Sequence, residues 1–460
     1  MSSLHEFATW EPLLRLLRAD NARSLAAPGG HVAGQISHYG WSLPLRRRIP
    51  RPGQAAQVED MQDEFDAVQR VQGALAESGA DSISFTAEIS PAGRTVLHLI
   101  GHGPAVEPGI GGPHPGSLIL VENSVPEPWR RLPDPVPGAG PAPSVDLALL
   151  ARTLRERIPG AIGATDAEIA ATEARLGVAL PDELKVLYRV TRARWEDWGE
   201  DYVVAERVFT AVGCELFPLD DLYIADAPSR PCPWRFAALE SVVTRPDAAV
   251  QGLVGSPGWI AFGDNGGGDR IAVDLTPGPR GHTGQIIMLN HEDNIGAGRL
   301  ADSLTSLVLN GPGPGHCGPH GDDPPAVARV NIRSLSSVQA AAHPGLEVLS
   351  IGVWDSAPLS LAPLTGLPRL RTLTAYPGTL ADPLEIAKLT GLEFLELGPD
   401  DWRVLLDAAA VPRSLSAAAI EVQGSRHPLP IVALANELLA LWDRPPITRT
   451  ILEGHLAPGA

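Results

Sequence analysis

The stretch "WIAFGDNGGGDRIAVDL" (residues 259–275) places a glycine-rich loop between two short apolar runs. In the second run, Ile271, Val273 and Leu275 alternate with other residues, which is typical of a β-strand. Glycine adopts positive φ angles without strain, and Asp and Asn tolerate them better than most residues do. The stretch therefore predicts two antiparallel strands joined by a tight turn over residues 264–269.

Three ligand-binding interpretations of this loop fail on spacing. A phosphate-binding P-loop requires a lysine, and none follows Gly268. A dinucleotide-binding loop requires a different glycine spacing and a following helix, whereas a strand is predicted here. A calcium-binding EF-hand requires oxygen ligands at the positions that Gly266 and Gly268 occupy. A turn is the first expectation, and a ligand site of another kind is the alternative.

Other polar and aromatic residues are candidates for binding a partner. Asp269 and Asp274 stand beside apolar strand residues, so we expect them to accept backbone hydrogen bonds or to belong to an exposed binding face. In "WEDWG", Trp195 and Trp198 lie three residues apart, on one face if this stretch is helical, and they serve either core packing or protein binding. The candidate partner-binding residues are Trp195, Trp198, Asp264, Asn265, Gly267, Gly268, Asp269 and Asp274.

No catalytic residue, metal site or cofactor is expected. No Ser/His/Asp order or carboxylate pair can be defended from spacing alone. The segment "GHCGPHGDD" supplies zinc-ligand residue types, namely His316, Cys317, His320, Asp322 and Asp323. Because it lies in a Gly/Pro-rich segment with no rigid frame to position ligands, we interpret it as incidental composition.

Helix signals precede the glycine loop. Thr165 and Glu168 form a predicted capping box, Gly177 is placed to end that helix, and Pro181 suits the start of the next one. Strand patterns follow, and "RLADSLTSLVLNG" (299–311) predicts a closing helix. The order helix–helix–sheet–helix indicates an α+β domain.

Three segments together resemble the SUKH superfamily, which is named partly for the yeast Smi/Knr regulator of cell-wall synthesis. They are "TDAEIAATEARLGVALPDELKVLYRVT" (165–191), "WIAFGDNGGGDRIAVDLTPG" (259–278) and the closing helix. The resemblance covers roughly residues 150–310 and implies a sheet packed against helices. It also implies a non-enzymatic role: bacterial members are commonly immunity proteins that neutralise toxins, and eukaryotic members are regulatory binding modules.

Two Pro- and Gly-rich segments divide the chain. We expect an α+β domain of unknown function over residues 1–121, a linker over 122–145, the SUKH-like domain over 146–310 and a second linker over 311–325. The first part predicts a helix over 58–75 and then a hairpin, "SISFTAEI", "SPAG" and "RTVLHLI".

Residues 326–460 contain a leucine motif that recurs. "LEVLSI" (346–351), "LRTLTA" (370–375) and "LEFLEL" (392–397) share it, with weaker copies at "VARVNI" (327–332) and "LSAAAI" (415–420). Spacings of 24 and 22 residues between the central leucines are typical of leucine-rich repeats. We predict a short repeat array, with unrelated half-buried strands as the alternative.

Charge and composition narrow the functional class. The 460-residue chain has a net charge of −18, which argues against nucleic acid as a partner. No apolar run approaches the roughly 20 residues of a membrane span, and Glu6, Glu11 and Asp20 interrupt the N-terminal segment, which is unlike a signal peptide. The odd number of cysteines, three, argues against a disulfide framework, so we expect a cytoplasmic protein.

The combined interpretation is an α+β, non-catalytic cytoplasmic protein that binds a protein partner, with a basic toxin among the candidates. On this hypothesis it is a bacterial immunity protein or a regulatory factor. The alternative is a metal- or nucleotide-dependent hydrolase that uses Asp264, Asp269 and Asp274 around a bound cation.

Overall fold

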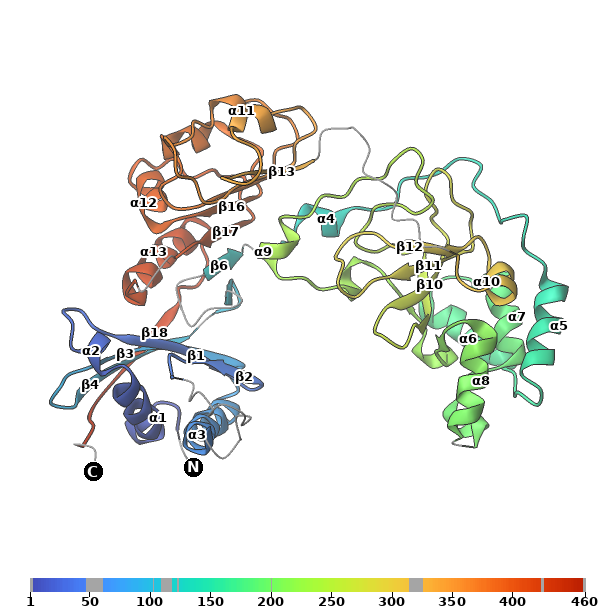
Figure 1. Cartoon of the computed structure of the whole chain (residues 1–460), viewed down its shortest axis with the longest axis horizontal. Helices are drawn as coiled ribbons and strands as arrows, with labels where there is room; N and C mark the ends of the chain where they lie inside the picture. Colours follow the sequence, from blue (N-terminus) through green and yellow to red (C-terminus); the bar gives the residue numbers. More distant parts are fainter. Residues whose placement is uncertain are drawn as a thin grey trace. The chain divides into compact units, whose positions relative to one another are not determined.

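The computed structural model describes residues 3–46, 61–101, 103–108, 118–121, 124–199, 201–313, 326–422 and 426–457. The chain divides into two compact units (Figure 1). The first unit combines Met1–Ser124 with Pro325–Ala460, and the second is Val125–Pro324. The N-terminal and C-terminal parts, which we predicted as separate domains, thus share one unit. The predicted domain boundaries themselves stay a prediction.

The N-terminal part of the first unit is an antiparallel sheet of order β18-β4-β3-β1-β2 with helices on one face (Figure 1). Its elements are α1 (Phe7–Asp20), α2 (Ala22–Leu25), β1 (Val32–Ser37), β2 (Gly40–Ser42), α3 (Gln62–Ser78), β3 (Ser82–Ile89), β4 (Arg94–Gly101) and β18 (Thr448–His455). The predicted hairpin is confirmed as β3 and β4. Helix α3 ends at Gly79 with φ +72°, and Val58 of the predicted helix lies outside the described residues. Trp10 packs edge-on against Phe85 in the core.

The repeat motif forms a parallel sheet in the same unit. The order is β13-β14-β15-β16-β17-β6-β5, and the neighbouring strands from β13 to β17 pair in parallel. The strands are β13 (Val327–Val330), β14 (Val348–Ile351), β15 (Thr372–Ala375), β16 (Phe394–Leu397), β17 (Ala417–Ile420), β6 (Leu118–Val121) and β5 (Val106–Pro108). Leu349, Leu373 and Leu395 stand in register and are fully buried. The leucine spacing therefore corresponds to stacked repeats, as predicted.

Short helices connect these strands and close the array. They are α11 (Val338–Ala341), η5 (Ala362–Leu364), η6 (Pro383–Lys388), α12 (Pro399–Asp407) and α13 (Pro428–Leu441). The antiparallel strand β6, which comes from far upstream, pairs with β17 and extends the sheet. The repeat sheet therefore includes strands that precede and strands that follow the second unit in the sequence.

The second unit packs helices against an antiparallel sheet of order β12-β11-β10-β9-β7, with β8 also paired to β9. The helices are α4 (Glu127–Arg130), α5 (Leu147–Arg157), α6 (Asp166–Leu176), α7 (Asp182–Val190), η2 (Trp195–Trp198), α8 (Tyr202–Val212), η3 (Leu219–Asp221), η4 (Ala227–Ser229), α9 (Trp234–Ala237) and α10 (Leu304–Asn310). The strands are β7 (Glu215–Leu216), β8 (Tyr223–Ile224), β9 (Trp259–Asp264), β10 (Arg270–Asp274), β11 (Gln285–Leu289) and β12 (Gly298–Ala301). This arrangement confirms the predicted α+β class.

Local signals set the helix ends in this unit. The capping box of Thr165 and Glu168 is present, and Gly177 ends α6 with φ 70°. Pro181 stands one residue before α7, where its missing N–H costs nothing. The predicted closing helix begins later than expected, at Leu304 after the N-cap Ser303, because residues 298–301 pair with β11 instead.

The proline-rich segment before α5 lies along the second unit. Asp134 exchanges two hydrogen bonds of 2.8 Å with the Gln251 side chain, and the Thr283 N–H donates to the Gly140 carbonyl at 3.0 Å. The Trp129 indole N–H donates to the Arg230 carbonyl at 2.8 Å. These contacts make residues 129–140 part of this unit's structure.

Among the described residues, no helix has both the length and the apolar composition needed to cross a bilayer.

Candidate functional site

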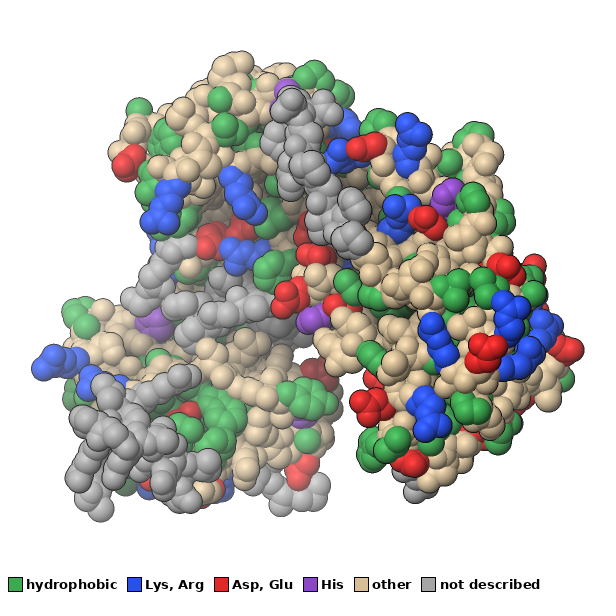
Figure 2. All heavy atoms as spheres, turned by 45° about the vertical axis from the view of Figure 1, so that its right-hand side comes forward, with side chains coloured by type: hydrophobic (Ala, Val, Ile, Leu, Met, Phe, Trp, Pro, Cys, Tyr) green, Lys and Arg blue, Asp and Glu red, His purple; other side chains and the backbone are tan. Residues whose placement is uncertain are grey.

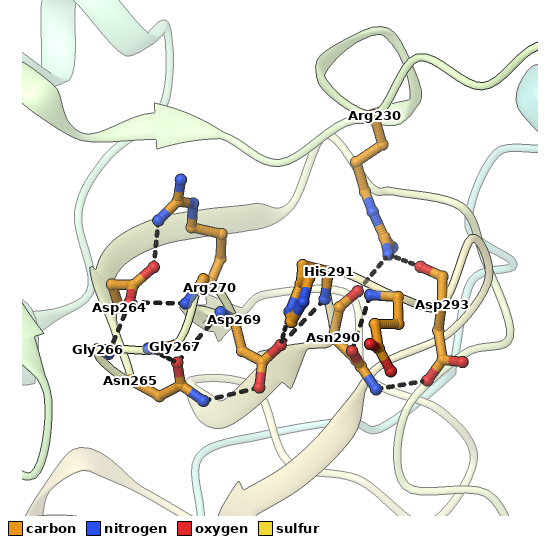
Figure 3. A network of polar contacts seen from close by, with 12 residues as sticks. Arg230, Asp264, Asn265, Gly266, Gly267, Asp269, Arg270, Asn290, His291 and Asp293 are labelled. Carbon is orange, nitrogen blue, oxygen red and sulfur yellow. Dashed lines mark hydrogen bonds and ion pairs between the residues drawn. The ribbon is translucent and has the colours of Figure 1, made fainter. Parts of the chain in front are cut away.

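The glycine loop is a turn between β9 and β10 that is closed by one backbone hydrogen bond, from the Asn265 N–H to the Asp269 carbonyl at 3.0 Å, and by side-chain hydrogen bonds (Figure 3). One carboxylate oxygen of Asp264 accepts the N–H of Gly266 at 2.6 Å and that of Gly268 at 3.3 Å. Its other oxygen pairs with the Arg270 guanidinium. Gly266 and Gly268 have φ values of +83° and +101°, so both positions favour glycine.

Asn265 closes the same turn from its other side. Its side-chain oxygen accepts the N–H of Gly267 at 2.7 Å and that of Asp269 at 3.1 Å. Its amide group donates to the Asp269 carboxylate at 2.7 Å. The predicted turn is present, and its polar side chains serve to hold the loop in shape.

Asp269 also links the turn to the residues after β11. Its carboxylate accepts the backbone N–H of His291 at 3.0 Å and lies 2.7 Å from the His291 Nδ1 (Figure 3). These hydrogen bonds lower the pKa of Asp269 below its ordinary value of 3.8. The same carboxylate raises the pKa of His291 above its ordinary value of 6.5.

The signs of the two shifts define a pH window for this link. The raised pKa of His291 stabilises the fold fully below pH 6.5, and the contribution disappears as the pH rises through the raised value. The lowered pKa of Asp269 stabilises the fold above pH 3.8, and this contribution is lost as the pH falls through the lowered value. The link is therefore strongest between pH 3.8 and 6.5.

We expect Asp269→Asn to lower the pKa of His291, because the amide removes the negative charge beside the ring. An NMR titration of the His291 ring proton in the full chain measures this shift, and the other histidine signals should not change between the two proteins. Titration of His291 at the same pH in both proteins would show that the carboxylate does not hold the ring.

Arg230 fixes the segment after β11 from the opposite side. Its guanidinium donates to the carbonyls of Val254 at 2.6 Å and Asn290 at 3.2 Å, and also to the carbonyl of Asp293 (Figure 3). Burial lowers the pKa of Arg230, which is the direction expected for a cation surrounded mainly by uncharged acceptors. Arg230 is thus a positioning residue whose donors are directed at the backbone.

A pocket of about 310 Å³ lies beside the turn. Its polar lining includes Tyr223, Arg230, Arg270, Asn290, His291 and Asp293. Most of these groups already bond to one another or to the backbone: Asn290 donates to Asp293 at 3.0 Å, and Arg270 pairs with Asp264. The Arg270 guanidinium also lies 5.7 Å from the centre of the Phe217 ring. The pocket is therefore a rigid, polar depression in which charged groups balance one another.

Asp274 lies at the far end of β10 and takes no part in this network. It lies four residues after Arg270, about 13 Å along the strand. It is fully buried, and its carboxylate accepts from the Trp259 indole at 2.9 Å, the Gln285 side chain at 2.8 Å and the Thr276 N–H at 2.8 Å. Burial raises the pKa of Asp274. Its predicted place on a partner-binding face is wrong, because no surface of the side chain is accessible.

The hydrolase alternative required Asp264, Asp269 and Asp274 around one cation. The structure keeps Asp274 apart from the other two, and all three carboxylates accept hydrogen bonds from named donors. Among the described residues, no three His, Cys, Asp or Glu side chains are grouped so that they could hold a metal ion. The candidates between His316 and Asp323 lie outside the described residues.

The two predicted tryptophans belong to a separate surface, which we call the aromatic patch. It consists of Trp195, Trp198, Tyr202, Val203 and Phe209 on η2 and α8. The Trp195 ring centre lies 6.1 Å from that of Trp198 and 4.9 Å from that of Tyr202, edge to face in both cases. Trp198 packs partly into the core, while Tyr202 is 79% exposed and Val203 62% exposed. Trp198 thus serves core packing in part, Trp195 stays partly exposed, and protein binding by the pair stays a prediction.

The sequence did not point to α8 or to the residues that hold the pocket. "YVVAERVFTAV" (202–212) is rich in β-branched and aromatic residues, which favour strands. Asp201 nevertheless caps the helix through the Val203 N–H at 2.8 Å, and Gly213 ends it. The N-cap Asp201 and the C-terminal Gly213 were therefore the sequence signals that could have indicated this helix. Arg230 and His291 have no local signal, because their partners are distant in sequence.

Family comparison identifies the second unit. Residues 163–310 match the SMI1 / KNR4 family (SUKH-1), a stretch that contains both helices of the capping-box region, the glycine turn and the closing helix. These residues form a SUKH-1 domain. The match covers about a third of the chain, so it assigns this domain and leaves the first unit unassigned.

The SUKH-1 domain is similar to fungal proteins with regulatory names. A glucan synthesis regulatory protein of Neurospora crassa is 34% identical over 101 residues, which are 21% of this chain and 19% of that protein. A KNR4/SMI1 homolog of Yarrowia lipolytica is 45% identical over 47 residues, 10% of this chain and 7% of that protein. The cell wall biosynthesis/cell cycle regulator smi1 of Schizosaccharomyces pombe is 41% identical over 49 residues, 11% and 10% of the two chains. The chain spans less than a fifth of the length of each.

These relatives correct one expectation. We expected a bacterial immunity protein that neutralises a toxin, following the bacterial members of the superfamily. The relatives are instead fungal and are named for glucan synthesis or cell-wall regulation, which contradicts that expectation. The resemblance to the superfamily itself is confirmed.

Proposed function

We propose that the chain is a non-catalytic regulatory protein whose SUKH-1 domain binds another protein through the aromatic patch. The observation that carries this proposal is the exposure of Trp195, Tyr202 and Val203 beside one another, at 36%, 79% and 62%. Single exposed apolar residues are common on protein surfaces, but clusters of large ones are typical of interaction sites. Tryptophan and tyrosine are also the residue types that contribute most at protein interfaces.

The glycine turn supports a binding role over a catalytic one. Asp264 and Asp269 accept hydrogen bonds or ion pairs on both oxygens from groups of the loop and its neighbours, so both carboxylates already serve to hold the turn. The turn, Arg230 and His291 together hold the pocket in one shape. In this proposal they hold the β9–β10 turn and the pocket beside it in one conformation. The role of Asn265, Gly267 and Gly268, which we predicted to be partner binding, is then to maintain that conformation.

The relatives' names suggest the process. Proteins named for glucan synthesis and cell-wall regulation share this domain, so we propose that the chain regulates glucan or cell-wall synthesis by binding a protein of that process. We also propose a cytoplasmic location. The free, buried thiol of Cys214 supports it, since such thiols are usual in reducing compartments.

The test compares the wild-type gene, its deletion, a double variant and a control variant in the cells that carry the gene. We expect the double variant Trp195→Ala/Tyr202→Ala to change glucan content as much as deletion of the gene does, since it removes the binding surface. Immunoblotting checks that the variant accumulates normally. Tyr39→Ala is the matched control, because Tyr39 is an exposed tyrosine of the first unit and should leave glucan unchanged.

Two outcomes would overturn this proposal. A double variant that behaves as wild type, while deletion alters glucan, would show that the patch is not the functional surface. Deletion without any change in glucan would show that the chain serves another process.

A further inference from the structure

The aromatic patch has an acidic border. Glu196, Asp201 and Glu206 are all exposed and lie on or beside η2 and α8. The space-filling view shows hydrophobic, acidic and basic side chains interspersed over the surface (Figure 2). A partner that covers the patch therefore meets apolar rings and carboxylates together.

These three carboxylates differ from the other acidic groups nearby. Asp197, in the same turn as Glu196, is bonded to the Arg192 guanidinium at 2.5 and 2.7 Å, which lowers the pKa of Asp197. Within the described part of the chain, no salt bridge involves Glu196, Asp201 or Glu206. Asp197 and, less strongly, Glu196 lie close enough to Arg192 to raise the pKa of that guanidinium, Asp201 caps α8, and the exposed Arg207 follows Glu206. All three carboxylates nevertheless stay exposed, so a partner's cations can reach them.

The helix geometry gives the patch a direction. Tyr202 and Phe209 are seven residues apart on α8 and therefore lie on one face, two turns from each other. Phe209 is 39% exposed, and Glu206 lies between them in the sequence, one turn after Tyr202. An apolar stripe with a carboxylate beside it is complementary to a segment whose apolar and basic residues alternate at helical spacing.

From this arrangement we infer that the aromatic patch binds a basic amphipathic segment of its partner, one in which Leu-like residues alternate with Lys or Arg at helical spacing. This inference rests on the proposed function and specifies the partner's chemistry. Lysine or arginine of the segment would lie over the Trp195 and Tyr202 rings and reach Glu196 and Glu206. A second copy of this chain is a poor occupant, because its net charge of −18 would repel the first.

Fluorescence anisotropy with the full chain tests the partner's charge. The probe is a labelled amphipathic helical peptide of Leu and Lys, and the comparison peptides carry Glu in place of Lys or the same residues in scrambled order. We expect the Leu–Lys peptide to bind best and to weaken as salt is raised. Equal binding of the Leu–Glu peptide would overturn the inference.

Variants test the place of binding. Tyr202→Ala should weaken binding of the Leu–Lys peptide by about tenfold or more, which is the usual effect of truncating an interface aromatic residue. The charge reversal Glu196→Lys/Glu206→Lys should transfer the preference to the Leu–Glu peptide. Tyr39→Ala should bind as wild type does. If Tyr202→Ala and Tyr39→Ala bind the peptide equally, the inference is wrong.

The two proposals can fail separately. If the patch variants abolish regulation of glucan in cells while the Leu–Glu peptide binds as well as the Leu–Lys peptide, only the basic character of the partner is wrong. If the patch variants leave glucan unchanged, the proposed function falls whatever peptide is bound.

Discussion

Asp274→Ala is expected to lower the free energy of unfolding of the SUKH-1 domain by about 3–4 kcal/mol. The side chain is fully buried and accepts hydrogen bonds from the Trp259 indole, the Gln285 amide and the Thr276 N–H. Alanine leaves the Trp259 and Thr276 donors without this acceptor inside the sheet, and each orphaned buried donor costs about 1–3 kcal/mol. Asp274 is thus a structural carboxylate, although its sequence position resembles that of a site residue.

Hydrogen exchange of the full chain, followed by mass spectrometry on peptides from β9 to β11, measures this effect directly. The expected loss of free energy of unfolding corresponds to a decrease of about 100- to 1,000-fold in the protection of these amides from hydrogen exchange. Asp302→Ala is the matched control: its carboxylate is half-exposed and makes a surface pair with Arg299 at 2.6 Å. Surface pairs of this kind contribute less than about 1 kcal/mol. Similar exchange in the two variants would contradict a structural role for Asp274.

Glu183→Ala is expected to cost about 3 kcal/mol, because this carboxylate holds the start of α10 from a distant helix. Glu183 on α7 is 6% exposed and accepts the N–H groups of Leu304 at 3.1 Å and Thr305 at 2.8 Å. It also accepts the Thr305 hydroxyl at 2.5 Å. The first N–H groups of a helix have no acceptor within the helix, so the Glu183 carboxylate supplies one. Its negative charge also interacts favourably with the helix dipole.

The neighbouring acid provides the control for Glu183. Asp182 is exposed in the same first turn of α7, and Asp182→Ala should cost at most about 0.5–1 kcal/mol through the helix dipole. The loss of stability caused by Glu183→Gln should fall between those of Glu183→Ala and Asp182→Ala, since glutamine keeps one oxygen that can accept hydrogen bonds. Thermal and urea unfolding of the full chain would rank the variants by stability, and hydrogen exchange of the α10 peptide would serve as the local probe. Equal stability of the Glu183 and Asp182 variants would refute the capping role.

Much of the fold was predictable because its signals are local. The capping box at Thr165 and Glu168, the stop at Gly177 and the β9–β10 turn each depend on residues within a few positions of one another. The repeat sheet was predictable from its leucine spacing, since each unit adds one buried Leu in register. The shared first unit was not predictable in this way: β18 pairs with β4 across more than 300 residues, and no local pattern encodes that pairing.

The candidate site was predictable only in part, for the same reason. The turn residues Asp264 to Asp269 bond within their own loop, so composition indicated a turn correctly. Asp274 was misplaced, because β10 is buried on both faces at its end, and the residues that cover the second face are distant in sequence. The exposure of Tyr202 depends on α8 being a helix, and its β-branched sequence concealed that helix.

The central claim is that the aromatic patch is a protein-binding surface, and site-specific crosslinking in cells tests it most directly. A photoreactive phenylalanine analogue replaces either Tyr202 or Tyr39 in the full chain, and crosslinked products are compared after illumination. The account predicts one discrete protein crosslinked from position 202 and absent from position 39, and the Leu–Lys peptide should compete with it in permeabilised cells. The same products from both positions, or none from position 202 in cells where deletion of the gene alters glucan, would contradict it.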